Sequence, residues 1–437
     1  MKTTQSTHIR ETVFLAGFGL RRHVHVPGIE AETEARESME ELTELARSAG
    51  AEQVGRMIQI RDAPDPATLF GKGKLEEIKQ EAEAHHATLL IVDASLNPGQ
   101  QRNIEKAVGL RTIDRVQLIL DIFARHARSR EGQLQVELAQ LNYMLPRLAG
   151  SSASLSRLGG GIGTRGPGEQ KLETDRRRIR RRIAHLEGSL ETVRRERALR
   201  RRARQDVPLA TIALVGYTNA GKSTLFNALT RANVTASPRM FATLDPTVRS
   251  LTLPSKRRVL VSDTVGFIRD LPPGLMTSFR ATLEELQQAA LILHVIDISS
   301  PRQAEQEVQV DKVLTDLDLE ARPRLRVFNK IDRLDQTQAP SPAAVAGGIS
   351  VSALTGTGLG DLIEAIDRAL PVDPIVKLHL RVPVRDGRRV AAIRASGRVL
   401  ESQVHDSELW MDVELPESAA RRLQGHGSEE PEPNAKS

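Results

Sequence analysis

The N-terminal part of the chain alternates short apolar runs with longer amphipathic stretches. Apolar runs bounded by turn residues predict strands, and apolar positions that recur every three or four residues predict helices. The predicted strands are Val13–Phe18, Val54–Ile60 and Thr88–Val92, and the predicted helices are Glu30–Ala49, Lys74–Ala84 and Gly99–Val108. Because strands alternate with helices, we expect a small α/β domain with a parallel sheet over residues 1–125.

Between residues 126 and 205 the apolar positions recur at alternating spacings of four and three. The first stripe contains Leu134, Leu138, Leu141, Leu145 and Leu148, and the second contains Leu172, Ile179, Ile183, Leu186, Leu190 and Val193. Each stripe forms a narrow apolar seam on a helix, and neither seam is long enough for an extended coiled coil. We therefore expect an antiparallel α-helical hairpin.

The loop between the two stripes, residues 150–168, is rich in glycine. Seven of the ten residues from Gly159 to Gly168 are Gly or Pro, and glycine at this density opposes both helix and strand. Composition alone favours a flexible connector at the tip of the hairpin.

The second hairpin helix carries the excess positive charge of the chain. Residues 169–204 contain 14 Lys or Arg and 6 Asp or Glu, which gives +8 against +6 for the whole chain. Arg176–Arg178 and Arg180–Arg182 flank Ile179 and cover most of the helix circumference. A solvated helix usually interleaves both signs, so we favour contact with a phosphate backbone. Tyr143 is the one aromatic residue nearby, which favours structured RNA read by shape over stacking on single strands.

From Thr211 to about Leu370 the α/β pattern returns, and it predicts a second α/β domain at residues 206–371. Residues 371–374, PVDP, are interpreted as a linker. Three strand-like segments follow, at Lys377–Val382, Arg398–Glu401 and Leu409–Val413, and they predict a small α+β domain at residues 372–424. We expect the polar tail, residues 425–437, to be disordered.

Composition narrows the class of protein. The 437 residues are 39% hydrophobic and 3% aromatic, so the cores are mostly aliphatic. The absence of Cys excludes disulfides and thiolate metal sites. No apolar run approaches the roughly 18 residues of a membrane span, and the first ten residues do not resemble a signal peptide. We expect a cytoplasmic, monomeric protein without a membrane span.

Candidate chemistry begins at Thr211–Val215, a buried strand by pattern that runs into Gly216-Tyr-Thr-Asn-Ala-Gly221-Lys222-Ser223 and then a helix. This sequence is a phosphate loop in its required strand–loop–helix context. Backbone N–H groups and the helix N-terminus would hold phosphates. Lys222 would contact the β- and γ-phosphates, and the Ser223 hydroxyl would ligate Mg²⁺.

Later motifs select guanine over adenine. Asp263-Thr-Val-Gly266 ends a strand, where Asp263 can hold Mg²⁺ through water and the Gly266 amide can sense the γ-phosphate. In Asn329-Lys-Ile-Asp332, the Asp332 carboxylate can accept two hydrogen bonds from guanine N1–H and its 2-amino group, which adenine lacks. Ser352-Ala353 offers a backbone N–H to guanine O6. Thr243 is predicted as the second Mg²⁺ ligand.

Taken together, these motifs predict a site for GTP and GDP with Mg²⁺ as cofactor. The predicted GTP contacts are Gly216, Tyr217, Thr218, Asn219, Ala220, Gly221, Lys222, Ser223, Thr224, Phe241, Ala242, Thr243, Leu244, Asp245, Asp263, Thr264, Val265, Gly266, Asn329, Lys330, Ile331, Asp332, Ser352 and Ala353. The predicted Mg²⁺ ligands are Ser223 and Thr243, and the catalytic positions are Lys222, Gly266 and Phe267.

The combination of GYTNAGKST, FATLDPT and DTVGFIRDLP with the upstream GGGIGTRGPGEQKLETDRR resembles the HflX family of ribosome-associated, translation-factor-class GTPases, over residues from about 10 to 370. The resemblance implies a P-loop GTPase domain with a doubly wound, mostly parallel sheet. An α/β domain with a helical hairpin would precede it, and a small α+β domain follows it in this chain.

The resemblance also implies binding to the large (50S) ribosomal subunit and GTP-dependent splitting of stalled or idle 70S ribosomes. The glycine-rich tip would then reach 23S rRNA near the peptidyl-transferase region and be a contact element rather than a connector. The predicted RNA contacts are Arg157, Arg165, Lys171, Arg176, Arg177, Arg178, Arg180, Arg181 and Arg182.

Hydrolysis is less well specified than binding. Ras-type GTPases place a water-orienting Gln directly after the DxxG motif, and Phe267 occupies that position here. We expect slow intrinsic hydrolysis, with Phe267 turned away and the catalytic geometry completed by a partner, the ribosome. Arg269 as an arginine finger acting in cis is a less favoured hypothesis.

Two alternative functions stay open at this point. The chain could be a GTPase of ribosome assembly or RNA modification, although no second catalytic constellation is visible. It could also be a non-enzymatic RNA-binding protein, but the intact Lys222, Ser223, Asp263 and Asp332 oppose this. Gly71-Lys-Gly-Lys74 is interpreted as a turn and helix start, because no clean buried strand precedes it, and it does not argue for a separate ATP site.

Overall fold

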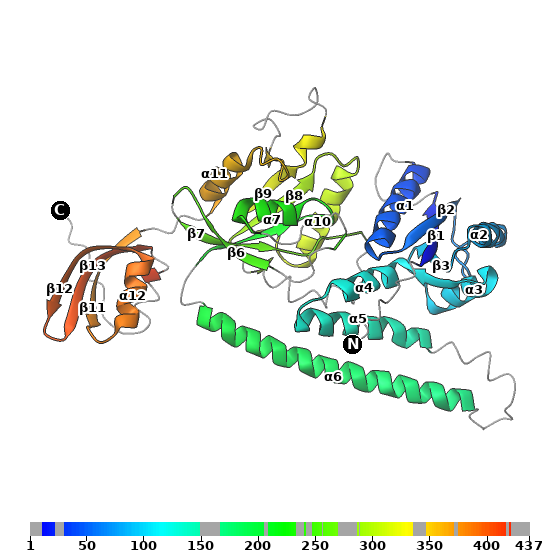
Figure 1. Cartoon of the computed structure of the whole chain (residues 1–437), viewed down its shortest axis with the longest axis horizontal. Helices are drawn as coiled ribbons and strands as arrows, with labels where there is room; N and C mark the ends of the chain where they lie inside the picture. The colour runs from blue at the N-terminus through cyan, green and yellow to red at the C-terminus, as the bar shows by residue number, and fades with distance from the viewer. Residues whose placement is uncertain are drawn as a thin grey trace, which may run out of the picture.

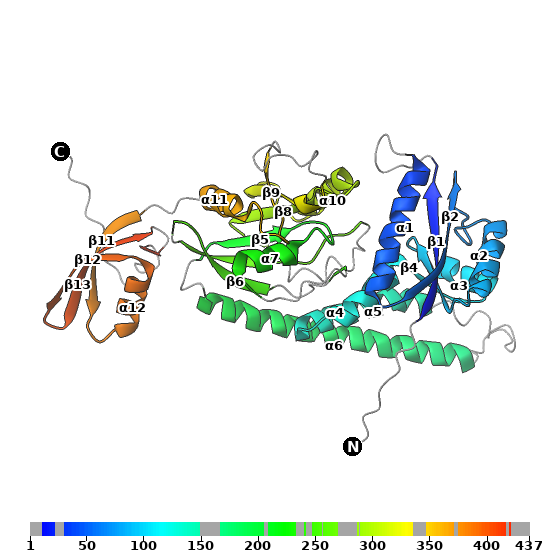
Figure 2. The same ribbon diagram turned by 45° about the horizontal axis from the view of Figure 1, so that its top comes forward.

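The computed structural model describes residues 11–21, 30–148, 167–204, 209–232, 240–241, 247–255, 257–269, 286–287, 289–334, 347–370, 375–416 and 419–420. Figures 1 and 2 show the second α/β domain in the middle, with the N-terminal domain on one side and the small C-terminal domain on the other. The long helix α6 (Pro167–Arg204) runs beside both α/β domains.

The N-terminal domain has a parallel sheet in the order β2-β1-β3-β4. The strands are β1 (Thr12–Leu20), β2 (Glu52–Arg61), β3 (Leu89–Asp93) and β4 (Arg111–Asp114), and the helices are α1 (Ala31–Ser48), α2 (Lys72–Ala84), α3 (Pro98–Val108) and α4 (Arg115–His126). The predicted small α/β domain is confirmed. The sequence pattern does not predict β4 and α4, because a four-residue strand runs directly into its helix through the Asp114 cap.

Alternation along β1 explains how both faces of this sheet are covered. Val13 and Leu15 pack with residues of α1 and α4, whereas Phe14 and Ala16 pack with residues of α2 and α3. Successive strand residues point to opposite faces, so a strand buried on both sides is apolar throughout. Gly71 is the N-cap of α2, as the turn-and-helix-start interpretation predicts.

The helical hairpin consists of α5 (Arg130–Leu148) and α6, which lie side by side (Figure 1). Leu186 and Leu190 of the second stripe are buried. Arg182 forms a bidentate ion pair with Glu137 of α5, at 2.7 and 2.8 Å, which joins the two helices. Helix α6 begins at Pro167, inside the segment predicted as loop, and residues 149–166 of that loop lie outside the described residues. The predicted hairpin is confirmed.

The central domain has a six-stranded sheet in the order β10-β9-β8-β5-β7-β6, parallel except for the β6–β7 pair. The strands are β5 (Thr211–Val215), β6 (Thr247–Thr252), β7 (Arg258–Asp263), β8 (Leu291–Asp297), β9 (Arg324–Asn329) and β10 (Gly348–Ser350). The helices are α7 (Lys222–Thr230), α10 (Gln303–Asp316), α11 (Leu359–Ala369) and the 3₁₀ turn η2 (Ile331–Arg333). The expected doubly wound sheet is confirmed.

The C-terminal domain is an antiparallel sheet in the order β11-β13-β12 with one helix packed on it. Its elements are β11 (Ile375–Pro383), α12 (Gly387–Ser396), β12 (Arg398–His405) and β13 (Glu408–Pro416). Ile393 of α12 is buried with Val382, Met411 and Val413 of the sheet. The predicted strands are confirmed, whereas α12 was not predicted. The tail, residues 425–437, lies outside the described residues, and no helix within the described part is long and apolar enough to cross a membrane.

Candidate nucleotide-binding site

The sequence motifs meet at one edge of the central sheet. The phosphate loop follows β5, Thr264–Phe267 follows β7, Asn329–Asp332 spans the end of β9, and Ser352-Ala353 follows β10. Strands β5 and β7 are parallel neighbours, as are β9 and β10, and only β8 lies between the two pairs, so the four carboxyl ends lie along the same edge. Ligands of open α/β sheets bind at this edge.

Two glycines of the phosphate loop are required by its backbone. Gly216 has φ +156°, and a Cβ there would lie 2.2 Å from the carbonyl oxygen of Val295. Gly221 has φ +91°, and a Cβ there would lie 2.3 Å from Nδ2 of Asn329. Because only glycine fits, the chain can turn tightly into α7, whose first N–H groups are available to an anion.

Lys222 lies folded against its own loop. Its Nζ donates hydrogen bonds to the carbonyl oxygens of Gly216 at 3.1 Å and Tyr217 at 2.8 Å. Burial of the ammonium group, with Lys330 nearby and against the attraction of Asp263, lowers the pKa of Lys222 to about 8. Such a buried ammonium gains a strong partner when a phosphate oxygen takes the place of these carbonyls.

Ser223 and Asp263 form an oxygen-rich pair next to the phosphate loop. The Ser223 hydroxyl donates to Oδ2 of Asp263 at 2.7 Å, and Asp263 is fully buried. A hydroxyl and a carboxylate are hard oxygen ligands, which Mg²⁺ prefers, so this pair fits the implied ion. The other predicted ligand, Thr243, lies outside the described residues together with Ala242, Leu244 and Asp245.

The segment after β7 lies directly on the phosphate loop. The carbonyl oxygen of Phe267 accepts the Thr218 N–H at 2.7 Å, and the Phe267 N–H donates to the carbonyl oxygen of Gly216 at 3.1 Å. A Cβ on Gly266 would lie 2.8 Å from Cγ2 of Thr218 and 3.1 Å from Nζ of Lys222. The Phe267 side chain is buried in the core, so in this arrangement it orients no water.

Asn329 links the motifs to one another. Its Nδ2 donates to the carbonyl oxygen of Ala220 at 2.9 Å, and its Oδ1 accepts the N–H of Ala353 at 3.0 Å. Asn329 is buried. Through its two hydrogen bonds it fixes the phosphate loop and the loop after β10 relative to the end of β9. Asn329, a predicted GTP contact, therefore also connects the loops that form the site.

Asp332 is exposed and held in place by a neighbour. Its Oδ1 accepts a hydrogen bond from the Ser352 hydroxyl at 2.6 Å. Lys330, with φ +70°, extends its Nζ to within 2.6 Å of Oδ2 of Asp297 at the end of β8. Among the described residues no other side chain is hydrogen-bonded to Asp332, and the Lys330 side chain extends from the end of β9 to the end of β8.

Tyr217 and Arg269 point toward the N-terminal domain. The Tyr217 hydroxyl donates to Oε1 of Glu41 at 2.9 Å and accepts the Arg269 N–H at 3.0 Å. The Arg269 guanidinium lies 3.6 Å from Glu34 of α1 and 3.7 Å from Glu305 of α10. The cis arginine-finger hypothesis is therefore not supported by this geometry, and the Tyr217 side chain is directed to the domain interface instead of to a nucleotide.

A buried ionic cluster continues from this contact. Arg115 lies 2.7 Å from Glu41 and 2.8 Å from Asp93, and Arg302 lies 3.3 Å from Glu41. Burial alone would raise the pKa of Glu41, but Arg115, Arg302 and Arg269 hold it below its usual value. The sequence carries no short-range signal for this cluster, since its members lie far apart along the chain.

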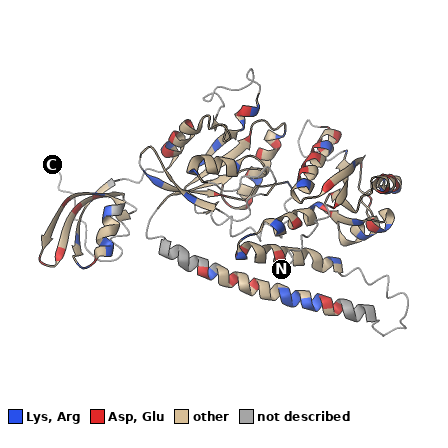
Figure 3. Cartoon of the chain, in the orientation of Figure 1, with Lys and Arg blue, Asp and Glu red and all other residues tan. Residues whose placement is uncertain are grey.

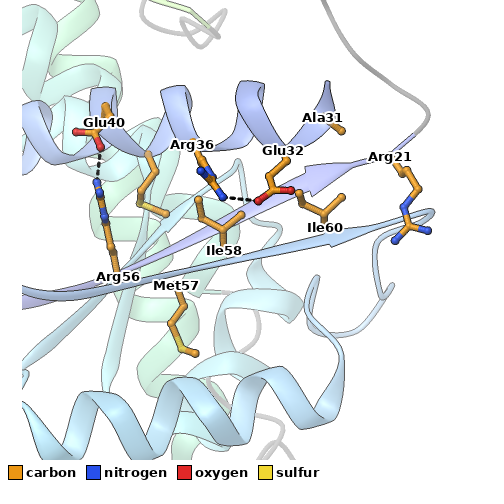
Figure 4. A pocket seen from close by; sticks show the side chains of 10 residues that line it. Arg21, Ala31, Glu32, Arg36, Glu40, Arg56, Met57, Ile58 and Ile60 are labelled. Atoms are coloured by element: carbon orange, nitrogen blue, oxygen red, sulfur yellow. Dashed lines mark hydrogen bonds and ion pairs between the residues drawn. The ribbon is translucent and has the colours of Figure 1, made fainter. Parts of the chain in front are cut away.

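A cavity of about 930 Å³ lies elsewhere, between α1 and β2 of the N-terminal domain (Figure 4). Its charged side chains are already paired, with Arg36 2.5 Å from Glu32 and Arg56 2.6 Å from Glu40. Its floor includes the apolar Ile58 and Ile60. This cavity gathers none of the predicted chemistry.

The predicted RNA contacts on α6 are mostly exposed. Figure 3 shows the basic stretch of this helix, where Arg177, Arg178, Arg180 and Arg181 face solvent. Arg182 is exposed but paired with Glu137, and Arg176 is partly buried. Arg157 and Arg165 lie outside the described residues, as does the side chain of Lys171.

Comparisons with known proteins agree with this order of parts. Three family models match: "GTP-binding GTPase N-terminal" over residues 36–124, "GTP-binding GTPase Middle Region" over 126–204 and "50S ribosome-binding GTPase" over 211–330. A protein called GTPase HflX from Caldanaerobacter subterraneus subsp. tengcongensis is 47% identical over 390 residues, which cover 89% of this chain and 90% of that protein.

The GTPase HflX of Escherichia coli is 42% identical over 395 residues, which cover 89% of this chain and 92% of that protein. Among solved structures, a GTP-binding protein from Sulfolobus solfataricus in complex with GDP covers 82% of this chain and 98% of that chain, at 25% identity and a TM-score of 0.43. The sequence likeness to the proteins called GTPase HflX extends over most of both chains.

Proposed function

The chain belongs to the HflX family of GTPases, and from this premise we propose that it is a cytoplasmic, GTP-switched factor that binds the large (50S) ribosomal subunit and dissociates stalled or idle 70S ribosomes. Its chemical activity is the hydrolysis of GTP. The observation that carries the ribosomal part is the long basic helix of the hairpin arm, supported by the ribosome-binding description of the family model over residues 211–330.

In the proposed nucleotide complex, each motif has one role. Lys222 leaves the carbonyls of its own loop and binds the β- and γ-phosphates. Ser223, Thr243 and Asp263 would hold Mg²⁺, and the ion would supply charge stabilisation to the phosphates. Asp332, oriented by Ser352, accepts the guanine N1–H and 2-amino group, so GTP and GDP are preferred over adenine nucleotides.

The arm supports RNA as the partner. Arg178, Arg180 and Arg181 are exposed on α6, and no ion pair to them occurs within the described part of the chain. The free-energy cost of removing such cations from water is offset by the release of counterions from the phosphates that they neutralise. Part of the positive charge of α6 is neutralised within the protein, where Arg182 pairs with Glu137 of α5.

Hydrolysis depends on the partner in this proposal. Phe267 is buried where a water-orienting side chain is expected, and Gly266 lies against Thr218 and Lys222. A γ-phosphate bound to Lys222 displaces the Gly266 segment, and the ribosome then completes the arrangement around the attacking water. We expect 50S subunits to raise GTP turnover at least about tenfold, and an absence of stimulation would contradict this part.

Sucrose-gradient profiles of 70S ribosomes, with protein and a non-hydrolysable GTP analogue, test the splitting activity. The proposal expects GTP-analogue-dependent loss of the 70S peak and growth of the subunit peaks. Lys222→Ala is the matched control, and it removes the phosphate contact and the splitting together. Binding confined to immature particles, with an unchanged 70S peak, would replace splitting by a role in assembly.

A further inference from the structure

The helical side of the C-terminal domain is strongly basic. Residues 385–396, RDGRRVAAIRAS, contain four Arg and one acidic residue. That residue, Asp386, is the N-cap of α12, and its carboxylate accepts the backbone N–H of Arg389 at 3.0 Å. Arg385, Arg388 and Arg394 are exposed, and Figure 3 shows basic positions along this helix. The α12 arginines, defined as Arg385, Arg388 and Arg394, therefore leave a strong positive charge at this surface.

The opposite face of the same domain is different. On the open face of its sheet, Lys377 lies 3.6 Å from Glu414, and His379 pairs with Asp412. Arg381 lies over the Trp410 ring, with 4.2 Å between Cζ and the ring centroid. Within the described residues no carboxylate pairs with Arg385, Arg388 or Arg394 in this way. Charge is thus balanced on the sheet and segregated on the helix.

The exposed side of α12 is smooth as well as basic. Val390 and Ile393 pack against the sheet, and Ile393 is fully buried. On the outer side, Ala391 and Ala392 are exposed. Alanines between arginines let a flat or convex partner approach the helix closely while the longer guanidinium groups reach around it.

We propose that the α12 arginines form a second RNA surface, which binds the sugar–phosphate backbone. Guanidinium groups match phosphate oxygens with two parallel hydrogen bonds, and every cation of this set is Arg. Trp410, the one tryptophan of the chain, lies on the sheet, so the helix side binds backbone rather than stacked bases. This goes beyond the proposed function, which leaves the C-terminal domain without a role.

The test uses the full chain and a fluorescent RNA duplex of about 20 base pairs, with binding followed by anisotropy from 50 to 200 mM salt. The variant Arg388→Gln/Arg394→Gln removes two exposed cations and keeps good helix formers. We expect the slope of log affinity against log salt to become shallower by nearly 2. The matched control Lys72→Gln/Lys312→Gln removes the same charge from exposed positions elsewhere, and its slope stays at the wild-type value.

Unchanged far-UV circular dichroism and thermal unfolding of both variants, together with unchanged GTP turnover, establish that the C-terminal and central domains are folded. An unchanged slope for the α12 variant would overturn the proposal, and so would an equal change in the control, which would indicate net charge alone. Poly-glutamate serves as a competitor at the same total charge as the RNA. If it displaces RNA from the wild type equally well, and this displacement depends on Arg388 and Arg394, the surface binds acidic protein and the RNA proposal is overturned. If only α6 substitutions affect RNA binding, this inference fails while the proposed ribosomal function stands.

Discussion

At the scale of single residues, the nucleotide site depends on side chains that hold one another. Asn329 binds the backbone of Ala220 and Ala353, so it positions two loops before any ligand arrives. Ser352 orients Asp332 at 2.6 Å. Asp332 is therefore the residue at which base choice can be tested without disturbing the fold, because it is exposed.

We predict that Asp332→Asn lowers GTP affinity by at least about 100-fold, because two hydrogen bonds to a charged acceptor are lost. Affinity for xanthosine triphosphate should rise, since the Asn amide can donate to the 2-oxo group. Competition binding with both nucleotides measures this. Asp318→Asn, an exposed position in the same domain, is the control with unchanged affinities. An equal loss for both nucleotides would contradict the assigned role.

His294 gives a second prediction at this scale. Burial on β8 lowers its pKa to about 4, whereas an unfolded His titrates near 6.5. Between these values the unfolded state binds more protons, so this group lowers the free energy of unfolding as the pH falls from about 6.5 to 4 and contributes nothing above that window. The full effect is about 3 kcal/mol.

Urea unfolding followed by circular dichroism between pH 7 and pH 4 measures this effect. His294→Leu should lose that part of the acid sensitivity, so the difference between variant and wild type grows as the pH falls. Carboxylates contribute equally to both curves and cancel in the comparison. Parallel curves for the two proteins would show that His294 is not the titrating group.

At the scale of elements, α6 combines two roles on one helix. Leu186 and Leu190 are buried on α6, which lies beside α5, and Arg182 forms an ion pair with Glu137 of α5. Arg177, Arg178, Arg180 and Arg181 face solvent because the seam occupies only a narrow stripe of the helix. Substitution of exposed arginines should therefore change binding to a polyanion and leave the hairpin intact.

We predict that Arg178→Gln/Arg180→Gln/Arg181→Gln flattens the salt dependence of 50S binding by between about 2 and 3 in slope. Co-sedimentation with 50S subunits over a range of salt measures it. The control Arg36→Gln/Arg47→Gln/Lys312→Gln removes equal charge from exposed residues on other helices. If the α6 substitutions leave the salt dependence of 50S binding unchanged, these arginines contact solvent and not phosphate.

At the scale of the whole molecule, the N-terminal and central domains share one core and one ionic cluster. Phe123 of α4 packs edge-on against Phe241, with 4.5 Å between ring centroids, and the Met240 N–H donates to the Ser48 hydroxyl at 2.8 Å. Glu41 meets Arg115 from its own domain and Tyr217 and Arg302 from the other. The two domains are therefore expected to unfold together.

We predict that Glu41→Gln lowers the free energy of unfolding by about 3 kcal/mol, because Arg115 and Arg302 lose a buried counter-charge. Tyr217→Phe removes the hydrogen bonds to Glu41 and from the Arg269 N–H, and should cost about 2 kcal/mol. Chemical unfolding curves measure both. Glu44→Gln removes only an exposed pair with Arg47 on the same helix and should cost less than about 0.5 kcal/mol. Equal costs at positions 41 and 44 would contradict a buried cluster.

Local sequence patterns are enough to predict the features that short stretches of chain encode. The phosphate loop, the DTVG and NKID motifs and the seams of the hairpin are local patterns, so their residues and order could be predicted together with the α/β fold class. Local pattern failed where an element has little periodic signal. Strand β4 has four residues, and the outer positions of α12 are alanine and arginine rather than an apolar stripe.

Tertiary structure alone decided which distant groups meet. Tyr217 lies 176 positions from Glu41, and Met240 lies 192 positions from Ser48. Such partners depend on how two sheets and their helices pack, which no neighbouring residue encodes. For the same reason, the motifs predict Tyr217 as a GTP contact and leave Arg269 open as an arginine finger acting in cis. In the structure, both side chains are directed toward the interface with the N-terminal domain.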